Sequence, residues 1–187
     1  MLWAPRVLGL DLSLTGTGIA RIGAEGVELL RTVRPGKATG HERIEFVLSA
    51  IDDAQRGQEL DLVVIEGPSY GNQGSGERQR GHHERAGLWW LVAHGLYARG
   101  RSYAVVAPAQ RAKYATGDGR SKKAAVVAAV RDRYGHLVPA IRNDNEADAL
   151  VLAAMGVDHL GGHLVDVPPV NRQALVKAAW PSTPADD

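Results

Sequence analysis

The sequence predicts an α/β domain built on one five-stranded mixed sheet with helices on its faces. Three short β-rich runs follow one another closely near the start of the chain, which favours antiparallel hairpins. Farther along, single β-rich runs alternate with helical patterns, and that order implies parallel strands joined by helical crossovers. With 187 residues, of which 44% are hydrophobic, the chain is long enough for one well-buried core and short for two.

The expected strands are short runs rich in apolar and β-branched residues. The first, residues 6–12, is largely apolar, and two more occupy residues 17–22 and 27–33. A fourth run, residues 61–66, is apolar through most of its length, which is typical of a central strand. The fifth run, residues 102–107, ends before a proline that cannot continue a ladder.

Helical spacing of apolar residues and capping signals mark the expected helices. Ser121 is a suitable N-cap for one of them, while Asn143 and Glu146 resemble a capping box for the last, which Gly156 would end. Residues 67–81 contain five glycines and predict a loop. The first expected helix begins at residue 42. Three more cover residues 84–99, 122–134 and 143–155.

Composition limits the domain organisation and the class of protein. Residues 1–165 are expected to form the folded domain, and four prolines predict a loosely attached tail over residues 166–187, which Trp180 would pin to the body. The absence of cysteine excludes disulfides, thiolate metal sites and a cysteine nucleophile, and favours a cytoplasmic location. We expect no signal peptide and no membrane association, because no apolar run approaches the ~20 residues that a membrane span needs.

Charge is unevenly distributed along the chain, although the net charge is only +1. Residues 67–123 carry a balance of +7 and the remaining segments a balance of −6. A basic segment between acidic ones indicates a surface that binds a polyanion, and a run of solvated charges is the alternative. The basic residues that would contact phosphates are Arg78, Arg80, Arg85, Arg111, Lys113, Arg120, Lys122 and Lys123.

Three acidic residues occupy positions where an unpaired carboxylate would be costly. Asp11 ends the first strand, Glu66 ends the fourth, and Asp148 lies among apolar residues of the last helix. If the two strands are parallel neighbours, their carboxylates emerge side by side, and a divalent cation relieves the repulsion. Mg²⁺, for which Mn²⁺ would substitute, prefers such oxygen ligands, and three carboxylates suit a two-metal phosphoryl-transfer site.

Two further oxygen donors precede Asp148 by about one helical turn. Asp144 and Asn145 can share its helix face. Either residue can supply a further ligand, Asp144 through its carboxylate and Asn145 through its amide carbonyl. The alternative for Asp144 is that it merely complements the helix dipole in the first turn.

The order and spacing of these motifs resemble the RuvC family of Holliday junction resolvases, which are ribonuclease H-like endonucleases. Glycines 16 and 18 form the Thr-Gly-x-Gly turn that the family places after the aspartate of its first strand. The four stretches that carry the resemblance are GLDLSLTGTGIA (9–20), LVVIEGPSYG (62–71), PAQRAKYATGDGRSKKAAV (108–126) and NEADALVLAAMG (145–156).

The resemblance implies a ribonuclease H-like fold and a Mg²⁺-dependent endonuclease. It implies that Asp11, Glu66 and Asp148 hold the metals, with Lys113 and Lys123 near the scissile phosphate. The substrate would be a four-way DNA junction, cut by symmetric paired nicks in recombination and repair. A homodimer is implied as well, with residues 84–99 as the candidate interface and with a branch-migration partner unidentified.

Departures from the family pattern keep other functions open. The family's residue three positions before the last aspartate is normally Asp or His, and here it is Asn145. A catalytically silent nucleic-acid-binding module is therefore an alternative, as is a related nuclease acting on RNA or on branched replication intermediates. Tyr70 is the nearest candidate for the aromatic residue that the family places after the strand-four glutamate, to insert at the junction.

Overall fold

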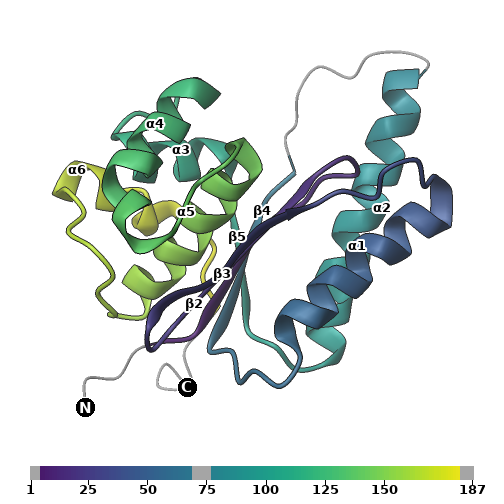
Figure 1. Cartoon of the computed structure of the whole chain (residues 1–187), viewed down its shortest axis with the longest axis horizontal. Helices are drawn as coiled ribbons and strands as arrows, with labels where there is room; N and C mark the ends of the chain where they lie inside the picture. Colours follow the sequence, from purple (N-terminus) through teal and green to yellow (C-terminus); the bar gives the residue numbers. More distant parts are fainter. Residues whose placement is uncertain (1–4, 69–76, 182–187) are drawn as a thin grey trace.

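The computed structural model describes residues 5–68 and 77–181, with the backbone alone for residues 77–80, and shows a five-stranded sheet between two layers of helices (Figure 1). The strands are β1 (Val7–Asp11), β2 (Thr17–Gly23), β3 (Gly26–Val33), β4 (Leu62–Glu66) and β5 (Tyr103–Val106). The helices are α1 (Gly40–Gln55), α2 (Glu77–Ala98), α3 (Pro108–Thr116), α4 (Lys123–Tyr134), α5 (Asp144–His159) and α6 (Pro169–Arg172). Two 3₁₀ turns, η1 (Gly135–Leu137) and η2 (Leu175–Lys177), complete the described elements.

The sheet has the strand order β3-β2-β1-β4-β5 and is mixed, as the sequence predicts. The hairpins β1–β2 and β2–β3 are antiparallel, whereas β1–β4 and β4–β5 are parallel. Leu10 pairs with Ile65, so the carboxyl ends of β1 and β4 lie next to each other in register. The crossovers through α1 and α2 supply the long connections that parallel pairing requires.

Each face of the sheet has its own core. Leu8 and Leu10 of β1 pack with Val63 and Ile65 of β4 under α1 and α2. The alternate residues of the same strands face the other layer, where α5 covers the sheet (Figure 1). The period of two along each strand thus separates two apolar faces, both of which are covered by helices.

Helix α5 approaches the sheet more closely than a larger side chain would allow. A Cβ added at Gly9 would lie 2.2 Å from the Ala149 carbonyl oxygen, and one added at Gly156 would lie 2.6 Å from Val7 Cγ1. The expectation that Gly156 ends the last helix is wrong, because α5 continues to His159. Gly156 is a packing contact inside the helix, where the absence of a side chain lets helix and sheet meet.

Two other helices differ from the sequence prediction. The expected loop over residues 67–81 is wrong for its last five residues, because α2 begins at Glu77 and runs through Gly81. A single glycine inside a helix costs only about 1 kcal/mol, which neighbouring residues can offset. Helix α3, which the sequence did not predict, starts at Pro108, and the Gln110 side chain accepts a hydrogen bond from Ala107 N at 2.9 Å. Proline at the first helical position is a signal that could have revealed it.

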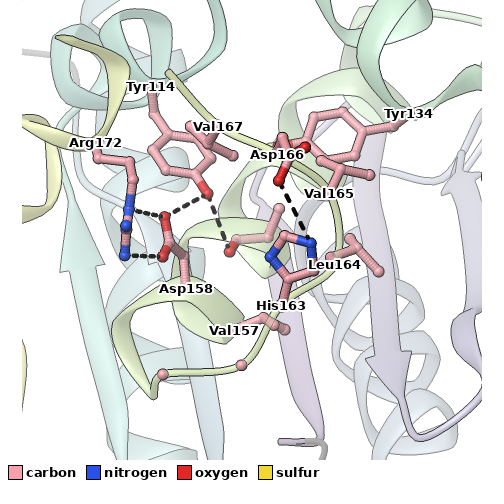
Figure 2. A pocket seen from close by; sticks show the side chains of 13 residues that line it. Tyr114, Tyr134, Val157, Asp158, His163, Leu164, Val165, Asp166, Val167 and Arg172 are labelled. Atoms are coloured by element: carbon pink, nitrogen blue, oxygen red, sulfur yellow. Dashed lines mark hydrogen bonds and ion pairs between the residues drawn. The ribbon is translucent and has the colours of Figure 1, made fainter. Parts of the chain in front are cut away.

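Residues 166–181 lie against the body of the protein. Trp180 stacks on His159 with 4.1 Å between ring centroids, and Ala179 forms an antiparallel bridge to Val105 at the edge of the sheet. Arg172 of α6 forms a bidentate ion pair with Asp158 (Figure 2). The division of the chain at residue 165 stays a prediction, and residues 182–187 lie outside the described residues. Within the described part, none of the helices has the length and apolar character to cross a membrane.

Candidate functional site

The alternation along β1 and β4 brings two carboxylates to the same face of the sheet. Leu10 and Ile65 face α1 and α2, so the next residues, Asp11 and Glu66, face α5. Both stand at the carboxyl ends of parallel neighbouring strands, where loops open the edge of an α/β sheet to ligands. The third carboxylate, Asp148, comes from the buried face of α5, the helix that covers this side.

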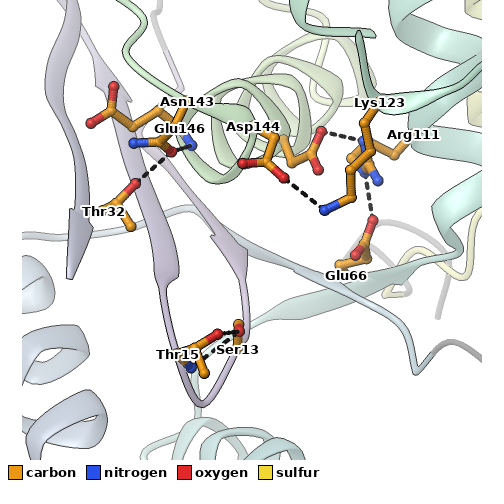
Figure 3. A network of polar contacts seen from close by, with 10 residues as sticks. Ser13, Thr15, Thr32, Glu66, Arg111, Lys123, Asn143, Asp144 and Glu146 are labelled. Atoms are coloured by element: carbon orange, nitrogen blue, oxygen red, sulfur yellow. Dashed lines mark hydrogen bonds and ion pairs between the residues drawn. The ribbon is translucent and has the colours of Figure 1, made fainter. Parts of the chain in front are cut away.

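The position of Asp148 depends on how α5 begins. Asn143 is the N-cap, and its side chain accepts a hydrogen bond from Glu146 N at 3.0 Å. The same Asn143 oxygen accepts from Thr32 Oγ1 of β3 at 2.8 Å, which ties the start of the helix to the sheet (Figure 3). The predicted capping signal is therefore confirmed, although Glu146 accepts from Arg142 N at 2.7 Å and not from the Asn143 amide.

The turn after Asp11 is closed by its own side chains. Thr17 is fully buried, and its hydroxyl donates to the Ser13 carbonyl oxygen at 2.7 Å while accepting from Ser13 N at 3.1 Å. Ser13 and Thr15 also share a hydrogen bond at the tip of the turn (Figure 3). This compact loop holds the end of β1 and, with it, the backbone of Asp11.

Arg111 of α3 lies between the carboxylates. Its Nε donates to Glu66 Oε1 at 2.5 Å (Figure 3), and its Nη1 donates to Asp148 Oδ1. The Arg111 side chain is only 10% exposed. This position differs from the expected surface contact with phosphate, and the reason is that residue 111 falls on the face of α3 that carries buried Ala112 and Ala115. An arginine at such a position needs carboxylate partners, which is the signal that sequence reasoning missed.

One guanidinium does not neutralise three carboxylates. Burial, followed by the charges of Glu66 and Asp148, raises the pKa of Asp11 to about 8 although Arg111 opposes the shift. Burial also raises the pKa of Asp148 to about 6, again against the charge of Arg111. The site therefore holds excess negative potential, which favours a proton or a further cation.

The donor set suits a hard divalent cation. Within the described residues, no three acidic or histidine side chains are arranged to hold a metal ion as they stand. Arg111 pairs with two of the three carboxylates. Three carboxylates with uncompensated charge nevertheless match the oxygen ligands that Mg²⁺ and Mn²⁺ prefer. Asp11, Glu66 and Asp148 are the residues that would hold such an ion.

Of the two candidates for a further ligand, Asp144 is paired with a lysine and Asn145 lies beside the turn after β1. Asp144 Oδ2 lies 2.6 Å from Lys123 Nζ (Figure 3), and this hydrogen bond lowers the pKa of Asp144 and raises that of Lys123. The Asn145 amide lies beside the turn after β1, because a Cβ added at Gly16 would be 2.9 Å from Asn145 Nδ2. The structure thus places Asp144 and Lys123 together at the rim of the carboxylate cluster.

The basic residues predicted to bind DNA are scattered around the site. Lys113 donates to Gln173 Oε1 at 3.1 Å, so it contacts the segment after α6 and not the carboxylates. Arg120 is exposed and pairs with Asp118, and Lys122 is exposed at the start of α4. Arg85 is exposed on α2, whose first residues include Arg78 and Arg80. The side chains of Arg78 and Arg80, and the whole of Tyr70, lie outside the described residues.

The sheet order and the two helical layers give a ribonuclease H-like fold, which solved structures of RuvC share. Thermus thermophilus RuvC in complex with a Holliday junction substrate aligns with a TM-score of 0.64 and 18% identity, over 88% of this chain and 99% of that one. A second structure of Thermus thermophilus RuvC aligns with a TM-score of 0.62 and 21% identity, over 87% of this chain and 99% of that one. The yeast mitochondrial Holliday junction resolvase Ydc2 aligns with a TM-score of 0.48 and 11% identity, over 81% of this chain and 78% of that one. No family model and no curated protein sequence matches the chain.

Proposed function

We propose that the protein is a metal-dependent endonuclease that resolves four-way DNA junctions by symmetric paired nicks. The observation that carries the proposal is the convergence of Asp11, Glu66 and Asp148 at the carboxyl ends of β1 and β4. This convergence occurs in a fold shared with RuvC, and a RuvC structure that aligns with the chain holds a Holliday junction substrate. A chain without cysteine also fits a reducing cytoplasm.

The proposed reaction is in-line attack of water on the scissile phosphodiester, leaving 5′-phosphate and 3′-hydroxyl ends. A bound Mg²⁺ would activate the water and stabilise the leaving oxygen. Asp11, Glu66 and Asp148 would hold the ion in their ionised forms, which would require Asp11 to lose the proton that its raised pKa retains. Lys123, whose side chain is largely exposed beside Asp144, would steady the phosphate charge.

Exposed cations near the site would position the DNA backbone. Lys122, Lys123 and Arg120 follow one another around the start of α4, and Arg85 adds a charge on α2. Contacts of this kind carry no sequence information and depend steeply on salt. They support binding of a branched DNA without defining which sequence is cut.

We propose a homodimer formed through α2. Trp90 and Tyr97 are 67% and 74% exposed and lie seven residues apart, so they share one face of the helix. Leu91 of α2 and Phe46 of α1 add exposed apolar surface in the same layer. Aromatic residues of this kind are enriched in protein interfaces, and two copies would supply one site for each of the two strands.

The decisive experiment is cleavage of a synthetic mobile four-way junction in Mg²⁺ by the wild type, Asp11→Asn and Glu66→Gln. We expect paired symmetric nicks from the wild type and none from either variant, with junction binding in Ca²⁺ retained by all three. Flap, RNA–DNA hybrid and single-stranded substrates in parallel would reveal a different nuclease specificity. Light scattering of the wild type and Trp90→Ser tests the dimer, which the substitution should weaken.

A second candidate function is a catalytically silent module that binds junctions. It is favoured by Arg111, whose guanidinium contacts two of the three carboxylates, and by the neutral Asn145 one turn before Asp148. This alternative predicts junction binding in Ca²⁺ or EDTA with no nicking at any Mg²⁺ or Mn²⁺ concentration. The cleavage experiment separates the two functions directly.

A further inference from the structure

Arg111 is a buried member of the carboxylate cluster, held in place by helix α3. It lies in the second turn of α3, a helix that Pro108 starts and that the Gln110 side chain caps. The neighbouring Ala112 and Ala115 are buried, which fixes this face of the helix against the protein. Withdrawing the guanidinium would leave the buried carboxylate of Asp148 and the half-buried carboxylate of Glu66 without the partner they now share.

The charges at the site leave room for one divalent ion beside Arg111. Asp11, Glu66 and Asp148 contribute three negative charges when ionised, and the guanidinium contributes one positive charge. One divalent ion brings this set to neutrality. A second would leave a net charge of +2 in a site where little water screens it, which is unfavourable unless further anions join.

The two candidate ligands for a second ion, Asn145 and Asp144, add no unpaired negative charge to the site. Asn145 is neutral and lies beside the turn at Gly16. Asp144 is paired with Lys123 at 2.6 Å, so its charge is already balanced. Among the described residues, each carboxylate of α5 apart from Asp148 already has a cationic partner: Asp144 pairs with Lys123, Glu146 with Arg142 and Asp158 with Arg172.

We propose that Arg111 takes the place of one of the two cations of a two-metal site, so that each chain binds a single divalent ion. This inference rests on the proposed nuclease function and specifies how that site is built. It separates this protein from a two-metal arrangement, in which Arg111 would have to leave before the second ion enters. The bound state would contain one ion and one guanidinium, sharing three carboxylates.

Metal binding to the metal-free protein tests this without any cleavage assay. Isothermal titration and the electron paramagnetic resonance of free Mn²⁺ give the number of ions per chain and their affinity. We expect one Mn²⁺ for the wild type and for Arg111→Lys, which keeps the charge. In Arg111→Met the first ion should bind about tenfold tighter or more, the size of effect that one neighbouring charge has on a carboxylate. Circular dichroism verifies that each variant is folded.

Arg172→Met is the matched control. It removes an arginine that also forms a bidentate pair with an aspartate, Asp158. Asp158 lies ten residues beyond Asp148, or about 15 Å along α5. This variant should bind Mn²⁺ as the wild type does, and a change as large as in Arg111→Met would mean that the effect is not local to the cluster.

Two results would overturn the inference. One is binding of two Mn²⁺ ions to the wild type, which needs no variant to be folded. The other is an unchanged affinity in a folded Arg111→Met. Neither result depends on the proposed nuclease function, which fails separately if the wild type binds one ion and a junction but makes no nicks. Conversely, junction cleavage by a wild type that holds two ions would keep the function and reject the role of Arg111.

Discussion

Gly18 of β2 lies directly against the backbone of Asn145 in α5: a Cβ added at Gly18 would be 2.0 Å from the Asn145 carbonyl oxygen. Gly18 also pairs with Asp11 in the β1–β2 hairpin. The same glycine therefore touches the strand that carries one carboxylate and the helix that carries another. The glycine at this position sets how closely Asp148 can approach Asp11.

Gly18→Ala should destabilise the protein and weaken the site. The added methyl group must push α5 from the sheet, and overpacking of this kind costs about 1–3 kcal/mol. Chemical denaturation measures the loss, and Mn²⁺ titration should show weaker binding because the carboxylates separate. Gly87→Ala is the control, since Gly87 lies inside α2 with open space around it. That substitution should stabilise the protein by about 0.5–1 kcal/mol, and an equal loss in both variants would contradict the argument.

The stability of the metal-free protein should fall as pH rises from 6.5 to 8.5. The pKa of Asp11 is raised in the folded state to about 8, from an ordinary value of 3.8. Between these values the folded protein holds a proton that the unfolded chain has lost. The free energy of unfolding therefore decreases as pH rises, and it levels off above the folded pKa. Thermal unfolding in EDTA across this pH range measures the slope.

Asp11→Asn should flatten that slope and stabilise the metal-free protein at pH 8.5. Removing one of three crowded negative charges should be worth about 1 kcal/mol or more, which is about 2–4 °C for a chain of this size. The same variant should make no nicks, which is the trade between stability and activity expected at a functional site. A slope identical to that of the wild type would show that Asp11 is not the titrating group.

Lys123→Gln should weaken junction binding uniformly and reduce its salt dependence. If Lys123 contacts a phosphate, the slope of log affinity against log salt should fall by about one. Thermal stability should change little, because the Lys123 side chain is 76% exposed and exposed ion pairs contribute only about 0–1 kcal/mol. Arg56→Gln is the control. Arg56 directly follows the end of α1 and forms an exposed ion pair with Asp53, in the last turn of that helix. An unchanged salt slope in Lys123→Gln would remove that residue from the DNA surface.

The sequence predicted the strands and the meeting of Asp11 with Glu66 because both follow from local pattern and strand adjacency. Arg111 could not be placed in the same way. Pro108 signals the start of α3, but no local pattern shows that residue 111 of this helix meets Glu66 and Asp148. Gly156 shows the same limit of local patterns. A glycine locally favours a helix end, but here it lies inside α5 and packs against Val7. Lys113 turns toward Gln173, sixty residues away in sequence, which no local pattern indicates.

Trp180→Ala should loosen residues 166–181 and release His159. The ring of His159 is stacked on Trp180 at 4.1 Å, and burial lowers the pKa of this histidine below its ordinary 6.5. A histidine kept neutral by burial stabilises the fold above pH 6.5, and that contribution is lost as pH falls through its folded pKa. Nuclear magnetic resonance titration should show the His159 pKa rising toward 6.5 in the variant, with a stability loss of about 1–3 kcal/mol.

The control for this last substitution is Val176→Ala, in the same segment but with a side chain that is 85% exposed. It should change neither the His159 pKa nor the stability by a measurable amount, because the valine contributes little buried surface. Limited proteolysis adds a second measurement, since cleavage within residues 166–181 should accelerate in Trp180→Ala alone. Equal cleavage rates in the wild type and Trp180→Ala would mean that the hydrogen bonds of Arg172 to Asp158 hold the segment without the aromatic stack.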